Sequence, residues 1–158
     1  MLENELERII QNIQTVRSES SSIEIKSASK GCPKVRDTLS SFSNQSGGGI
    51  LIFGVDESDG FTVCGVYDAA DLMKKVEAQC LEMTPVIRPL FTVLAIDGKT
   101  VVSAEIQEID NADKPCFYSG VGRLKGSYIR SGDADRLMTE YEVYSFEAFR
   151  KKIQDELR

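Results

Sequence analysis

The chain has 158 residues, of which 41% are hydrophobic and 28% are charged, with a formal net charge of -6 and no histidine. This size and composition predict one globular domain with a buried core. The absence of histidine excludes a histidine-based catalytic triad and a cysteine–histidine zinc site. The four cysteines (Cys32, Cys64, Cys80 and Cys116) form no C-x-x-C pair, which argues against a zinc ribbon.

The sequence contains no run of about 18 apolar residues, so we expect no transmembrane helix and no membrane partner. The charged start MLENELERII does not resemble a secretory signal peptide. We therefore expect a cytoplasmic protein, in which the cysteines stay reduced and mostly buried.

The first quarter of the chain predicts a helix, a strand and a second helix. Apolar residues recur at helical spacing over residues 1–16, and serines within 18–22 end this amphipathic helix. IEIK, residues 23–26, alternates apolar and charged residues, which is typical of a strand. Pro33 suits the first turn of a helix carrying the apolar stripe V-x3-L-x2-F.

Three glycines at 47–49 end that helix, and ILIFGV, residues 50–55, is typical of a buried strand. The acidic stretch DESDG, residues 56–60, predicts a hairpin-like turn into a strand over 61–66. Asp68 then predicts the N-cap of a helix with apolar residues every four positions.

The second half continues with a hairpin and a final helix. D-G-K at 97–99 joins predicted strands at 86–96 and 100–109, and a further strand is expected at 124–129. Thr139, with glutamate three residues later, predicts a capping box that opens a helix over 139–157. The pattern is that of a single α+β domain, 1–158, with a mixed, mostly antiparallel sheet and flanking helices.

The triple glycine raises the question of a phosphate-binding loop. Such a loop follows a strand and precedes a helix, with G-x-x-x-x-G-K-[ST] as its pattern. Here the order is helix, glycines, strand, and no lysine follows Gly49. We expect the glycines to supply left-handed backbone and close approach to a neighbouring strand.

Positive charge is concentrated in two segments, 17–36 and 114–136, and in each of them five basic residues oppose two acidic ones. The remainder of the chain is strongly acidic. Such polarity fits one basic face on an acidic body, as nucleic-acid-binding proteins have. Ordinary solvated charges on two surface segments are the alternative.

Three segments in this order carry a resemblance to a known family: ESSSIEIK (19–26), LSSFSNQSGGGILIFGVDESDGFTVCGV (39–66) and KPCFYSGVGRLKGSYIRSG (114–132). Together they resemble the Schlafen/AlbA-like domain, with a core over 17–142. The sequence departs from the family pattern at Ser43, Ile25 and Glu57, where a small apolar residue, phenylalanine and aspartate are usual.

The resemblance implies a DNA-binding regulatory domain of bacterial regulator-like proteins, in which an ATP-binding region frequently follows. The chain would then be part of a longer protein or a stand-alone version. Related Schlafen proteins use two copies of a similar lobe to bind and cut structured RNA. One copy here implies a homodimer, by analogy.

A metal-dependent endoribonuclease is the alternative enzyme. Its site would use Glu19, Glu24 and either Asp56 or Glu57 to hold Mg²⁺ or Mn²⁺, hard cations that prefer carboxylate oxygens. The metal ligands would be Glu19, Glu24 and Asp56. Equally, Glu24 can belong to a solvated strand face and DESDG to an ordinary turn. Without cleavage no cofactor is expected.

For binding to DNA or RNA, the candidates are the basic residues of the two positive segments and one tyrosine: Lys26, Lys30, Lys34, Arg36, Arg123, Lys125, Tyr128 and Arg130. The cations would contact phosphates, and Tyr128 or Tyr118 would stack on an unpaired base. As alternatives, the tyrosines are half-buried strand residues, and Arg130 pairs with Glu24 or another acid. A third interpretation is a protein-interaction or oligomerisation domain that uses the terminal helices.

Overall fold

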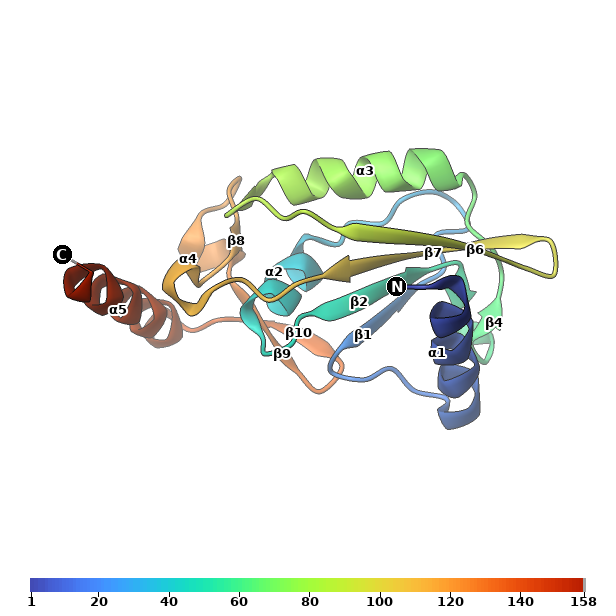
Figure 1. Ribbon diagram of the computed structural model, residues 1–158, viewed down its shortest axis with the longest axis horizontal. Coiled ribbons are helices and arrows are strands. Elements are labelled where there is room, and N and C mark those ends of the chain that lie inside the picture. The colour runs from blue at the N-terminus through green and yellow to red at the C-terminus, as the bar shows by residue number, and fades with distance from the viewer. Residues whose placement is uncertain (158) are drawn as a thin grey trace.

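A computed structural model describes residues 1–157 (Figure 1). The elements in chain order are α1 (Glu3–Val16), β1 (Ile23–Lys26), α2 (Arg36–Asn44), β2 (Gly49–Phe53), β3 (Val55–Asp56), the 3-10 turn η1 (Glu57–Asp59), β4 (Thr62–Val63), α3 (Ala69–Leu81), β5 (Met83–Thr84), β6 (Leu90–Ile96), β7 (Lys99–Ile106), the 3-10 turn η2 (Asn111–Asp113), β8 (Phe117–Tyr118), α4 (Arg123–Gly126), β9 (Tyr128–Ser131), β10 (Ala134–Leu137) and α5 (Glu140–Glu156).

The central sheet has four strands in the order β1-β2-β7-β6. Strand β1 runs parallel to β2, whereas the β2–β7 and β7–β6 pairs are antiparallel. Three two-stranded ribbons, β9–β10, β3–β4 and β5–β8, surround it. The predicted α+β class with a mixed, mostly antiparallel sheet is confirmed.

Helices cover both faces of the sheet. Neighbouring residues of a strand point to opposite faces, and both faces of β2 carry apolar side chains that must be buried. Helix α1 packs Leu6 and Ile10 with Ile52 on one face. Helices α2 and α3 pack Phe42 and Val76 on the other. Figure 1 shows α1 and α3 on opposite sides of the sheet. A strand that is buried on both faces needs apolar residues at every position, which is why the segment ILIF of β2 contains no polar residue.

The glycines serve the backbone, as predicted. Gly47 and Gly48 have φ angles of 81° and 69°, in the left-handed region. A side chain on Gly48 would overlap the carbonyl oxygen of Ile106, and one on Gly49 would overlap the Phe42 ring. The three glycines therefore let α2 turn back tightly against β2 and β7.

Several sequence predictions were wrong in their bounds. The strands expected at 61–66, 86–96 and 100–109 are β4 (Thr62–Val63), β6 (Leu90–Ile96) and β7 (Lys99–Ile106). Helix α2 begins at Arg36 instead of near Pro33, because a side chain of α3 holds the preceding turn: Gln79 donates to the Pro33 carbonyl (3.0 Å) and accepts from the Val35 amide (2.8 Å). The first half of the strand expected at 124–129 belongs to α4, and β9 starts only at Tyr128.

The predicted helix caps and the predicted turn at 97–99 were correct. Asp68 caps α3, and Thr139 forms the predicted capping box with Glu142 at the start of α5. The turn at 97–99 joins β6 and β7 directly. Figure 1 shows α5 projecting from the rest of the molecule, and Val143 is its one buried residue among those described. No helix in residues 1–157 combines the length and apolarity needed to cross a membrane.

Candidate nucleic-acid interface

A pocket of about 280 Å³ lies between the start of α2 and the β8–α4–β9 region. We call it the basic pocket, and its lining consists of Lys34, Arg36, Asp37, Tyr118, Val121, Lys125, Gly126 and Tyr128. Four of the predicted binding residues, which come from both positive segments, therefore meet in one place.

Arg36 is fixed in this pocket by an acid and an aromatic ring. Its Nη2 donates to both carboxylate oxygens of Glu82, at 2.9 and 3.1 Å, and its guanidinium carbon lies 4.3 Å from the centre of the Tyr118 ring. Lys34 and Lys125 are exposed and have no ion pair among the described residues. Their ammonium groups are the ones available to an incoming anion.

One acid faces into the basic pocket. Desolvation, followed by repulsion from Asp135, raises the pKa of the Asp37 carboxyl, while the Tyr128 hydroxyl and Lys26 act in the opposite direction. The pKa of Tyr128 is raised in turn, mainly by desolvation and next by Asp37. Three cations and one acid line the pocket, so its charge remains positive.

The other predicted basic residues do not line the basic pocket. Lys26 lies 3.6 Å from Glu24, and Lys30 is exposed on the loop after β1. Arg123 donates to Glu147 of α5 at 2.8 Å and lies over the ring of Tyr144.

Arg130 is surrounded by acids. Its Nη1 donates to Glu24 (2.7 Å) and to Asp135 (3.0 Å), and its Nη2 lies 3.9 Å from a Glu19 oxygen. We call these four side chains the arginine cluster. The Arg130 side chain is 0% exposed and its guanidinium carbon lies 5.2 Å from the centre of the Phe42 ring. It offers no surface to a phosphate, and the structure matches the alternative in which Arg130 holds the fold together.

Glu19 is the most perturbed acid of the cluster. Its Oε1 accepts the Ile25 amide at 2.9 Å, and its side chain is 5% exposed. Burial raises its pKa to about 7, and repulsion from Glu24 and Glu57 adds to this, although the amide bond and Arg130 act in the opposite direction. A large part of the Glu19 population is therefore protonated at neutral pH.

The predicted metal ligands do not fit a divalent cation as they are placed. Glu19 and Glu24 converge on the guanidinium of Arg130, which already supplies the positive charge. Asp56 caps the turn that follows it, where its Oδ1 accepts from the amide and the hydroxyl of Ser58 at 3.0 and 2.6 Å. Within residues 1–157, no three acids, cysteines or histidines are grouped to hold a metal.

Sequence reasoning missed the polar residues on the buried side of α2. Thr38 donates to Asp135 at 2.6 Å. Asn44 donates to the carbonyls of Cys116 and Tyr128, both at 3.1 Å, and accepts the Cys116 amide at 2.7 Å. These bonds tie α2 to Cys116, which precedes β8, and to strands β9 and β10. The composition of the segment RDTLSSFSN could have indicated them. It carries many polar residues beside apolar ones that must be buried, and buried polar groups need hydrogen-bond partners.

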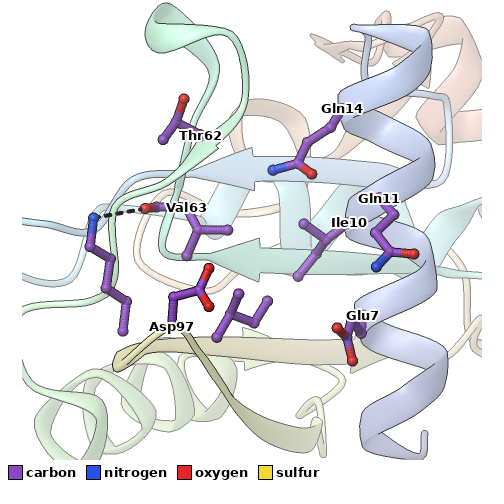
Figure 2. A pocket seen from close by; sticks show the side chains of 9 residues that line it. Glu7, Ile10, Gln11, Gln14, Thr62, Val63 and Asp97 are labelled. Carbon is purple, nitrogen blue, oxygen red and sulfur yellow. Dashed lines mark hydrogen bonds between the residues drawn. The ribbon is translucent and has the colours of Figure 1, made fainter.

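A second, larger pocket of about 460 Å³ lies between α1, β4 and the turn between β6 and β7 (Figure 2). Figure 2 shows Glu7 and Asp97 in its wall, and the ammonium of Lys99 donates to the Val63 carbonyl at 3.3 Å. With two acids and a base that is already engaged, this pocket suits a phosphate less well than the basic pocket does.

A family comparison decides the classification. The profile of the family described as Schlafen, AlbA_2 matches residues 19–139. The chain belongs to this family. A search of the curated proteins gave no match.

Two solved structures resemble this member of the Schlafen AlbA_2 family. The first is the N-terminal domain of a protein from Nitrosomonas europaea that is related to the ATP-dependent DNA helicase RecG; it is 28% identical, with a TM-score of 0.61, and the match covers 84% of this chain and 92% of that one. The second is the DIP2311 protein from Corynebacterium diphtheriae, which is 16% identical with a TM-score of 0.55. That match covers 91% of this chain but 28% of the other, and it shows a shared fold.

Proposed function

We propose that this domain binds nucleic acid through the basic pocket. The observation that supports the proposal is the meeting of Lys34 and Arg36 with Lys125 and Tyr128, two groups about ninety residues apart in sequence, in a protein that is acidic overall. Because the protein carries a net charge of -6, it would repel a phosphate backbone over most of its surface. The three cations and two tyrosines of the basic pocket form a local exception. A phosphate backbone supplies the matching charge.

The residues divide into two roles in this proposal. Lys34 and Lys125, which are exposed and unpaired among the described residues, contact phosphates. Arg36 is held by Glu82 and Tyr118, so it presents a fixed guanidinium edge. Tyr128 provides an aromatic wall against which a base can lie. Contacts of this kind carry little sequence information, so we expect weak sequence preference.

The biological setting is also a proposal. One neighbour is the N-terminal domain of a helicase-related protein, and this supports the idea of a DNA-binding regulatory domain in a longer cytoplasmic protein with an ATP-binding region. The same neighbour supports DNA over RNA as the partner. A homodimer is part of the same proposal.

The first experiment is a titration of fluorescently labelled double-stranded DNA, single-stranded DNA and an RNA hairpin, read by anisotropy at several salt concentrations. The test variant is Lys34→Gln/Lys125→Gln. If both lysines contact phosphates, the slope of log K against log salt falls in magnitude by about 1.4 for single strands or about 1.8 for duplex DNA. The control variant is Lys74→Gln/Lys152→Gln, which removes the same charge at two exposed sites away from the pocket.

Two outcomes contradict the proposal. Equal losses in the test and control variants would mean that binding responds to net charge alone, and salt-insensitive binding would mean that phosphates are not the ligand. The same samples, incubated with and without Mn²⁺, also report the length of the nucleic acid. Mn²⁺-dependent shortening that disappears in Glu24→Gln would restore the nuclease interpretation.

A further inference from the structure

The edge of the central sheet formed by β6 is unprotected. Its sequence, LFTVLAI, contains no charge and no proline. No other strand pairs with its outer side in residues 1–157, since β6 is last in the order β1-β2-β7-β6. Leu90 and Val93 are 52% and 40% exposed. Monomeric proteins usually block such an edge with lysine, proline or a bulge, because a free edge pairs with other chains.

The turn at its end identifies the free backbone groups. Asp97 and Gly98 both have positive φ, 49° and 78°, as in the two-residue turn that closes a hairpin. In this turn the flanking residues, Ile96 and Lys99, form a hydrogen-bonded pair, and bonded pairs then recur at every second residue. The amides and carbonyls of residues 90, 92, 94 and 96 therefore face β7. Those of 91, 93 and 95 face outward.

We propose that this edge is a self-association site, at which β6 pairs antiparallel with β6 of a second copy of the chain. Closed dimers use a two-fold axis, so the same patch must complement itself. An axis through Val93 places Val93 opposite its counterpart and Phe91 opposite the partner's Ala95. In this register every outward amide and carbonyl of residues 91, 93 and 95 gains a bonded partner.

The side chains and charges of β6 are compatible with pairing to a second copy of the chain. The register sets a large side chain, Phe91, against a small one, Ala95, so the two do not compete for space. It also brings the Arg88 end of each strand beside the Asp97 end of the other, and both residues are exposed. Because β6 itself is uncharged, no like charges meet across the pair. Self-pairing would continue the four-stranded sheet across the axis into a second molecule.

The proposal specifies the interface of the homodimer named under the proposed function. Its test measures mass in solution by sedimentation velocity over a range of protein concentrations, without nucleic acid, so that its outcome is independent of nucleic-acid binding. We expect wild type to populate a species of twice the chain mass and Val93→Lys to remain monomeric. Val16→Lys is the matched control, because it places the same charge at a valine that is 61% exposed at the end of α1. Circular dichroism establishes that each variant is folded.

Cysteine variants test the register. Val93→Cys brings two thiols together at the axis, with Cα atoms about 5.5 Å apart, within the range of a disulfide. Position 95 is exposed, as position 93 is, but in this register the two thiols of Ala95→Cys lie more than about 13 Å apart along the strands. Oxidation should link Val93→Cys and leave Ala95→Cys at the level of wild type. A monomer at every concentration, a dimer that Val93→Lys does not weaken, or equal linking of both cysteine variants would overturn the proposal.

Discussion

Replacing Arg130 with methionine removes the positive centre of the arginine cluster while keeping most of the side-chain volume. Glu24 and Asp135, 12% and 15% exposed, then lose a partner at 2.7 and 3.0 Å. Removing one partner of a buried pair costs about 3–5 kcal/mol, because the other charge stays buried without compensation. For a chain of this size that loss lowers the melting temperature by roughly 6–20 °C.

The assay is urea unfolding followed by circular dichroism, with Arg123→Met as the matched control. Arg123 pairs with Glu147, but these side chains are 46% and 31% exposed, so its loss should cost at most about 1 kcal/mol. A cost of Arg130→Met as small as that of the control would refute the reasoning, since the acids would then be solvated without the arginine.

Three further predictions concern single side chains. Because the pKa of Glu19 is about 7 in the folded chain and near 4.5 when unfolded, the native state binds more protons between these values, so stability falls as pH rises from about 4.5 to 7, by up to about 3 kcal/mol. Glu19→Gln should remove this slope and be more stable than wild type at pH 8, as measured by urea unfolding; an unchanged slope would assign the titration elsewhere. Gly49→Ala should cost about 1–3 kcal/mol, because the added methyl group overlaps the Phe42 ring. In Gly47→Ala the added methyl group meets no atom within 4 Å, so the cost should be about 1 kcal/mol, from the positive φ alone. Equal melting temperatures of the two variants would contradict the packing argument. Asn44→Ala should cost about 2 kcal/mol, because the Tyr128 carbonyl loses the Asn44 donor while the Cys116 carbonyl keeps only the Ser40 hydroxyl, and amide hydrogen exchange should increase first at Cys116, whose N–H loses its acceptor.

Features encoded within a few neighbouring residues could be predicted. The D-G turn between β6 and β7, the Asp68 cap and the capping box at Thr139 all depend on contacts with the next three residues. The resemblance to the family likewise depends on three short continuous segments of the sequence. Together with the apolar patterns of the helices and strands, these signals were sufficient for the fold class.

The candidate site was predictable only in part, because its charged side chains pair with residues that are distant in sequence. Arg130 and Arg123 look alike in sequence, yet Arg130 is buried against Glu24, whereas Arg123 of α4 is exposed and contacts Glu147 of α5. Helix α2 starts late because Gln79, more than forty residues on, holds the preceding turn. No property of one short segment indicates such pairings.

The arginine cluster and Asn44 also bear on how the chain folds as it is synthesised. The four strands of the central sheet are complete once Ile106 has been made. Asn44, Thr38 and Glu24, however, find their partners only at residues 116, 128, 130 and 135. A nascent chain that paused between these points would have its sheet in place and its buried polar groups unsatisfied. Final closure should therefore wait for β9 and β10 to leave the ribosome, and contacts of such long sequence separation slow the last step.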